Sequence, residues 1–215
     1  MRVRVSAVDV VSGLLFLVAI GLLVRPGSAA RATFERWLTV RRISVEAEKH
    51  WPALSELSTP LFSGHGEPDI IEFIDYECLY CRLISPSVDS AVEAGVRVGV
   101  VHVPAPTRSS AKQASLVALC AAQVGRYPDV HRYLMSTEDW RNEAGKSLIA
   151  AIGDSGESAA VEKCLEDSAA EPQIAASAEL AERIGIVGTP MFVAKGRVLT
   201  DALSAENLTR FARER

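Results

Sequence analysis

Two cysteines three residues apart, Cys78 and Cys81, constrain most strongly what this chain can fold into. They follow the apolar run D-I-I-E-F-I-D (69–75), which has the length and composition of a strand. They precede R-L-I-S-P-S-V-D-S-A-V-E-A (82–94), whose apolar residues recur at helical intervals. The sequence therefore predicts a strand, a tight corner and a helix that begins at the cysteine pair. Backbone N–H groups and the dipole at such a helix N-terminus favour a thiolate over a thiol.

Composition and cysteine spacing narrow the function classes. The 215 residues, 48% of them hydrophobic, can bury one sizeable core, so we expect one main domain. A net charge of -4 gives no basic field for nucleic acid, which we exclude as a partner. Zinc sites usually supply a second, matching cysteine pair, whereas Cys120 and Cys164 stand singly in helix-like segments. We expect no metal.

The first 30 residues differ in kind from the rest. Residues 5–24 carry a single charge, Asp9, and as a helix they would measure about 30 Å, one hydrocarbon thickness. We predict an N-terminal transmembrane helix that anchors the chain in a single pass. The alternative is a signal segment cleaved after S-A-A (28–30), which would leave a secreted, soluble protein. Arginines after the segment outnumber those before it, which opposes an exported orientation of the domain.

Residues 31–63 have the pattern of a connecting helical arm. Phe34, Trp37 and Leu38 alternate with arginine and glutamate at helical spacing. This pattern suits an amphipathic helix at a membrane interface, and it suits a solvated linker helix equally well. The loop G-H-G-E-P (64–68) then ends the arm, so we expect the main domain to cover residues 64–215.

A second element lies more than 100 residues after the cysteine pair. The stretch G-I-V-G-T-P-M-F-V (185–193) places Pro190 directly before a strand-like run. Proline cannot donate to a ladder of backbone hydrogen bonds and belongs at the start of a strand. Gly-Thr-Pro in a tight corner favours a cis peptide before Pro190, and a trans proline that opens a hairpin is the ordinary alternative.

These motifs, in this order, resemble the DsbA-like branch of exported thiol-disulfide oxidoreductases, which have the thioredoxin fold. C-L-Y-C-R-L-I-S-P (78–86) resembles the active-site helix of that fold, including the proline eight residues after the first cysteine, here Pro86. V-G-T-P-M-F-V (187–193) resembles its cis-proline loop. The resemblance implies an α/β thioredoxin fold with a helical insertion at about residues 107–184, preceded here by the N-terminal transmembrane helix.

The resemblance also implies a role for individual residues. Cys78 would form the mixed disulfide with a substrate, and Cys81 would resolve it. Glu72 falls where the family keeps a buried acid beneath the second cysteine, and it would relay a proton. Thr189 and Pro190 would hold a substrate strand by backbone pairing. This chemistry needs no cofactor and no metal.

The predicted partners follow from the same resemblance. They are exported proteins that contain cysteine, a membrane redox partner that recycles the cysteine pair, and the membrane itself through the N-terminal helix. The catalytic domain would face the periplasm or the cell exterior. Leu79 and Tyr80 replace the proline and histidine common in the family, so a strongly oxidising potential does not follow. Two alternatives stay open: a dedicated reductase for one partner, and a binding or assembly module whose Cys78–Cys81 disulfide is structural.

The other two cysteines lie on separate predicted helices of the insertion. Some DsbA-like proteins carry an extra disulfide there, so the resemblance implies a structural disulfide between Cys120 and Cys164. Such a bond would close a loop of about 45 residues and stabilise the domain by about 4 kcal/mol. The alternative is two separate buried thiols, since cysteine packs well as a small apolar side chain.

Overall fold

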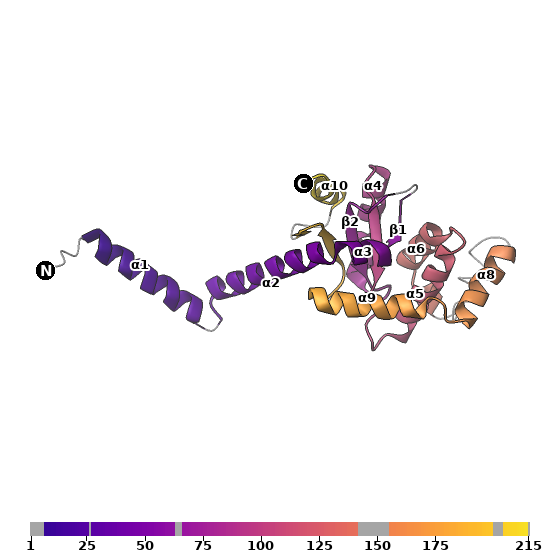
Figure 1. Ribbon diagram of the computed structural model, residues 1–215, viewed down its shortest axis with the longest axis horizontal. Helices are drawn as coiled ribbons and strands as arrows, with labels where there is room; N and C mark the ends of the chain where they lie inside the picture. Colours follow the sequence, from indigo (N-terminus) through magenta and orange to yellow (C-terminus); the bar gives the residue numbers. More distant parts are fainter. Residues whose placement is uncertain (1–6, 26, 63–65, 142–154, 200–203, 215) are drawn as a thin grey trace. The chain divides into compact units, whose positions relative to one another are not determined.

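The computed structural model describes residues 7–25, 27–62, 66–141, 155–199 and 204–214 (Figure 1). The chain divides into two compact units, residues 1–42 and 43–215. The second unit therefore begins within the arm that we predicted for residues 31–63. The helices are α1 (Ala7–Val24), α2 (Ala29–Lys49), α3 (Trp51–Leu57), α4 (Leu79–Glu93), α5 (Ser109–Ala122), α6 (Tyr127–Ser136), η1 (Asp139–Arg141), α8 (Ser155–Glu166), α9 (Glu171–Ile184) and α10 (Ala205–Arg213).

The N-terminal segment forms a helix. Helix α1 runs from Ala7 to Val24, within the apolar residues 5–24 of the sequence. In the parts of the chain that the structure describes, no helix is both long and apolar enough to cross a membrane. The transmembrane helix that we predicted within residues 1–30 is therefore not supported by the structure.

A five-stranded sheet forms the centre of the second unit. Its strands are β1 (Thr59–Pro60), β2 (Ile70–Ile74), β3 (Val98–His102), β4 (Met191–Ala194) and β5 (Arg197–Val198), in the spatial order β1-β3-β2-β4-β5. Strand β2 pairs with β3 in parallel and with β4 in antiparallel orientation. The parallel pair is joined through α4, as expected of a strand–helix–strand crossover. All residues of β2 and β3 are buried, because helices cover both faces of the sheet.

The two faces of the sheet pack against different helices because side chains alternate along a strand. Ile71 and Phe73 point to the face covered by α3, α9 and the end of α2. Ile70 and Ile74 point to the opposite face, where α4, α10 and the helical insertion pack. Glu72 lies between Ile70 and Ile74 in the alternation, so its carboxyl faces α4 and not α9.

Helices α5, α6, η1, α8 and α9 lie between β3 and β4, within the range of about 107–184 predicted for the helical insertion. Helix α9 packs on the sheet through Leu180, Ala181 and Ile184, so it belongs to the two-faced core. It ends at Gly185, whose φ of 93° is left-handed and favours glycine. Residues 142–154 of the predicted insertion lie outside the described part of the chain.

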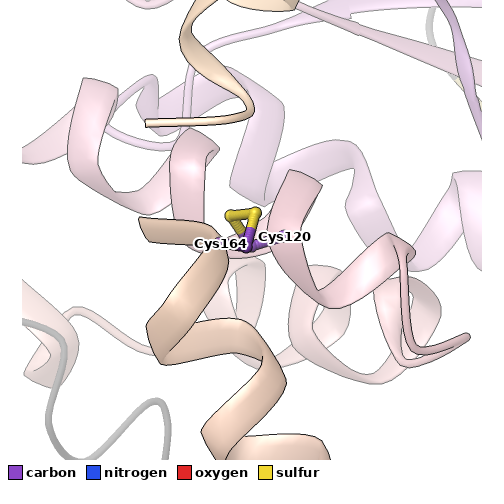
Figure 2. Close-up of a disulfide and its surroundings, with 2 residues drawn as sticks. All are labelled: Cys120 and Cys164. Atoms are coloured by element: carbon purple, nitrogen blue, oxygen red, sulfur yellow. A yellow bond between two sulfur atoms is a disulfide. The ribbon is translucent and has the colours of Figure 1, made fainter. Parts of the chain in front are cut away.

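A disulfide ties two helices of the insertion together. Figure 2 shows Cys120 bonded to Cys164. Cys120 belongs to α5 and Cys164 to α8, and their Cα atoms are 5.7 Å apart. Both cysteines are buried in the larger apolar cluster. Because α5 and α8 are 44 residues apart at these positions, the bond closes a long loop.

Candidate active site

The corner between β2 and α4 holds the nucleophile candidate. Cys78 is the N-cap residue of α4, and its Sγ accepts a hydrogen bond from the backbone N–H of Cys81 at 3.3 Å. Its backbone is extended, and the helix begins at the next residue. Cys78 is 8% exposed and Cys81 is fully buried, and both are free thiols. Both cysteines are buried, and of the two only Cys78 keeps an exposed fraction, as expected of the attacking residue.

A loop from the far end of the chain closes over Cys78. The Thr189–Pro190 peptide bond is cis, and β4 begins at the next residue. The Cys78 thiol donates a hydrogen bond to the Thr189 carbonyl oxygen at 3.2 Å, although the two residues are 111 apart in sequence. Pro190 has no N–H, so the strand starts there without leaving an unpaired donor. The structure therefore brings the predicted substrate-binding loop into contact with the predicted nucleophile.

Glu72 is a buried acid beneath this corner. Its side chain is almost completely removed from solvent, opposite Val100 and Phe192 in the sheet register. Burial raises the pKa of Glu72 to about 8, and negative charge at Asp89 and Cys78 acts in the same direction. Burial also raises the pKa of the Cys81 thiol, and the charge of Glu72 raises it further. Glu72 can thus change its protonation state near neutral pH, next to a thiol that resists ionisation.

Asp75 fixes the backbone of the corner, and the sequence analysis did not single it out. Its buried Oδ1 accepts from the Glu77 N–H at 2.7 Å, while Oδ2 accepts from the Ala105 N–H at 3.0 Å. Arg108 donates to the same Oδ2 at 3.2 Å. These bonds join the residues before Cys78 to the loop after β3. An aspartate directly after a strand is a known turn former, and this signal was present in the sequence.

An apolar groove of about 780 Å³ runs beside Cys78. One wall is the start of α4 with the exposed side chains of Leu79 and Tyr80, and the other includes Val187 and Thr189 of the cis-proline loop. Val187 is among the most exposed large apolar side chains of the described residues. Apolar surface left open next to a reactive group is typical of a binding site.

Comparison of the sequence with protein-family models assigns the chain to a family. Residues 63–213 match the family model described as thioredoxin, which is well over half of the chain. The chain belongs to the thioredoxin family. No curated protein matches its sequence significantly.

Solved structures of thioredoxin-family proteins share the fold. A thioredoxin-like oxidoreductase from Silicibacter pomeroyi superimposes with a TM-score of 0.61 at 26% identity, covering 74% of this chain and 93% of its own. The thiol-disulfide exchange protein α-DsbA2 from Wolbachia pipientis gives a TM-score of 0.65 at 18% identity, with 79% and 94% covered. A linker-deletion variant of Proteus mirabilis ScsC gives 0.64 at 19% identity, with 99% and 97% covered. The predicted α/β thioredoxin fold is confirmed, and the likeness to the DsbA-type structures is one of fold.

One polar cluster beside the site was missed at the level of sequence. Tyr76 and Tyr127 contact His102 and His131, and all four side chains are buried. The Tyr76 hydroxyl lies 3.1 Å from His131 Nδ1, and the Tyr127 hydroxyl lies 3.0 Å from His102 Nε2. Burial lowers the pKa of each histidine to about 3, so both are neutral at physiological pH. No local pattern marks these residues, because three separate segments supply them.

Proposed function

We propose that this thioredoxin-family protein exchanges disulfides with protein substrates through Cys78 and Cys81. The observation that carries the proposal is the free cysteine pair at the N-terminus of α4, facing the cis-proline loop. A thiolate at Cys78 would attack one sulfur of a substrate disulfide, and the other substrate sulfur would leave as a thiolate. Cys81 would then attack Cys78, release the second substrate thiolate and form the Cys78–Cys81 disulfide. Two electrons pass to the substrate, and the reverse sequence oxidises it.

Glu72 would supply the proton transfer that this sequence requires. The Cys81 thiol is buried and its pKa is raised, so it needs a base before it can attack Cys78. The Glu72 carboxyl is buried below the same corner, and its pKa of about 8 lets it hold or accept a proton near neutral pH. In the oxidising direction the same carboxyl would return the proton to Cys81.

Substrate would lie in the groove beside Cys78 as an extended segment. The Thr189 carbonyl oxygen already accepts a hydrogen bond from the Cys78 thiol, and Pro190 starts the neighbouring strand β4. A substrate backbone pairing at Thr189 would place its sulfur next to Cys78. The apolar groove walls suit the apolar side chains that an unfolded protein exposes. Backbone pairing reads no sequence, so many substrates would be accepted.

The proposed substrates are exported proteins that contain cysteine. The Cys120–Cys164 disulfide supports this, because structural disulfides persist in oxidising compartments and are rare in the cytosol. A membrane redox partner would return the Cys78–Cys81 pair to its starting state after each cycle. The direction of net electron flow then depends on that partner and on the potential of the pair.

Exchange with a model substrate tests the proposal. The wild-type protein should reduce or oxidise an unfolded disulfide-containing protein, and Cys78→Ser should lower the rate to the uncatalysed background. The double variant Cys120→Ala with Cys164→Ala is the control, and it should keep its exchange activity under conditions where it is folded. A wild-type rate in Cys78→Ser contradicts the proposal. A potential of the Cys78–Cys81 pair below about -300 mV, typical of inert disulfides, would favour a binding module instead.

A further inference from the structure

The first unit carries an exposed aromatic face that the redox site does not use. Within α2, Phe34 is 47% exposed, Trp37 is 53% exposed and Leu38 is 45% exposed. Their spacing of three and four residues places them on one side of the helix. The rings of Phe34 and Trp37 stack with centroids 6.0 Å apart. Contiguous exposed apolar side chains of this size mark an interaction surface.

The same segment is strongly basic, although the whole chain is acidic. Residues 25–42 contain five arginines and one glutamate, a net charge of +4, whereas the complete chain has a net charge of -4. Arg31 pairs with Glu35 at 2.7 Å, and the guanidinium of Arg41 lies over the Trp37 ring at 5.6 Å from its centroid. The partner of this face is therefore expected to be anionic, with an apolar layer for the aromatic rings.

Helix α1 adds an independent indication of that apolar layer. The consecutive residues Leu14, Leu15, Phe16 and Leu17 are all exposed, and four consecutive residues of a helix point in all directions around its axis. The apolar surface of the first unit therefore extends beyond α2.

We propose that residues 29–42 of α2 bind the surface of an anionic lipid bilayer. Phe34, Trp37 and Leu38 enter the boundary between headgroups and acyl chains, and the arginines contact lipid phosphates. Tryptophan and arginine are the side chains that favour this depth, because each combines an apolar body with a polar end. A second copy of the chain is the weaker candidate for this face, since four arginines against one glutamate in residues 29–42 would bring two charges of +3 together.

Trp37 gives a direct test, because it is the exposed tryptophan. The chain has three tryptophans, and the other two, Trp51 and Trp140, are 3% and 4% exposed. Quenching of tryptophan emission by acrylamide in the full-length protein therefore reports mainly on Trp37. Vesicles of phosphatidylcholine with phosphatidylglycerol should shift this emission to shorter wavelength and protect it from acrylamide. The variant Trp37→Phe should show neither change.

Charge variants test the electrostatic part of the proposal. Arg36→Gln with Arg42→Gln should weaken binding to the vesicles. The lipid concentration that gives half of the full protection of Trp37 should rise by about fivefold for each arginine removed. The control variant Lys163→Gln with Arg183→Gln removes the same charge from the second unit. Its Trp37 should be protected at the same lipid concentration as in the wild type. If acrylamide quenches Trp37 equally well with and without these vesicles, the proposal is overturned, and this part of α2 is a solvated linker helix. Equal protection by pure phosphatidylcholine, or protection without lipid that grows with protein concentration, would also overturn it, the latter in favour of self-association.

Discussion

The two cysteine pairs of this protein contain the same side chains in opposite settings. Cys78 and Cys81 lie at the strand-to-helix corner, three residues apart, and are free thiols. Cys120 and Cys164 lie on two helices of the insertion, 44 residues apart, and are bonded to each other. Cys78 lines the groove, whereas neither Cys120 nor Cys164 does, although all four cysteines belong to the same apolar cluster. The comparison indicates that surroundings, rather than the thiol itself, separate the free pair proposed to be reactive from the bonded one.

Polar neighbours account for much of this difference. Cys78 has a backbone N–H and a carbonyl oxygen at its sulfur, and the buried Glu72 helps to raise the pKa of Cys81. Cys120 and Cys164 are bonded to each other among the apolar side chains of the larger cluster. The predictions below test whether this contrast holds, beginning with the largest expected effect.

The most sensitive test concerns the asymmetry within the reactive pair. Cys81→Ser should leave Cys78 able to attack but unable to be released, so covalent mixed disulfides with substrate should accumulate. Cys78→Ser should give none, because the remaining thiol is buried and its pKa is raised. Non-reducing electrophoresis after thiol blocking, followed by mass spectrometry, measures the adducts. Adducts at Cys120 or Cys164 would break the contrast between the two pairs.

Removal of the structural pair should affect stability and not chemistry. Cys120→Ala with Cys164→Ala should lower the free energy of unfolding by about 4 kcal/mol on the chain-entropy account of a loop this long. Urea unfolding of the double variant and of the wild type measures the loss. Two alkylatable thiols at Cys120 and Cys164 in wild-type protein purified under thiol-blocking conditions would contradict the disulfide. A much smaller loss would mean that the unfolded chain retains structure in this loop.

Glu72 should make the stability of the reduced protein depend on pH. Its pKa rises from 4.5 to about 8 on folding, so between these values the folded protein holds a proton that the unfolded chain has released. The stabilisation is complete below pH 4.5 and is lost as the pH rises towards 8. Glu72→Gln should therefore gain stability over the wild type by up to about 1.4 kcal/mol per pH unit in this window.

Denaturant unfolding at pH 5, 6.5 and 8 measures this dependence, with the exposed Glu162→Gln as the control. The control should follow the wild type at each pH. The exchange rate of Glu72→Gln should also lose its dependence on a group that titrates near pH 8, if this carboxyl serves Cys81. Parallel stability curves for Glu72→Gln and the wild type would mean that the carboxyl is solvated and its pKa is ordinary.

The smallest expected effect concerns the tyrosine–histidine cluster behind the reactive corner. Tyr127→Phe removes the hydroxyl that lies 3.0 Å from His102 Nε2, and it should cost about 1 to 3 kcal/mol because a buried polar atom loses its partner. The exchange rate should stay unchanged. Tyr133→Phe on the same helix is the control, and it should leave both quantities as they are. A loss of exchange activity in Tyr127→Phe would extend the reactive site into the insertion.

Local patterns in the sequence predicted the elements of the site. The strand before Cys78, the helix after it and the proline that starts β4 were all predictable, because each is encoded in neighbouring residues. Glu72 stood out for a similar reason, as a charged residue in an apolar strand. The predicted transmembrane helix illustrates the limit of such patterns. Its apolar composition was clear, yet no helix among the described residues is long and apolar enough to cross a membrane.

Tertiary structure decided which of these elements meet. The sequence left the peptide bond before Pro190 open between cis and trans, and it gave no distance between Thr189 and Cys78, which are in hydrogen-bond contact. It marked neither the Asp75–Arg108 contact nor the buried histidines. Each of these depends on how β2, β3 and β4 pair and on where the insertion packs. A short stretch of sequence determines its own backbone preference, but burial and long-range contact are properties of the packed sheet and its helices.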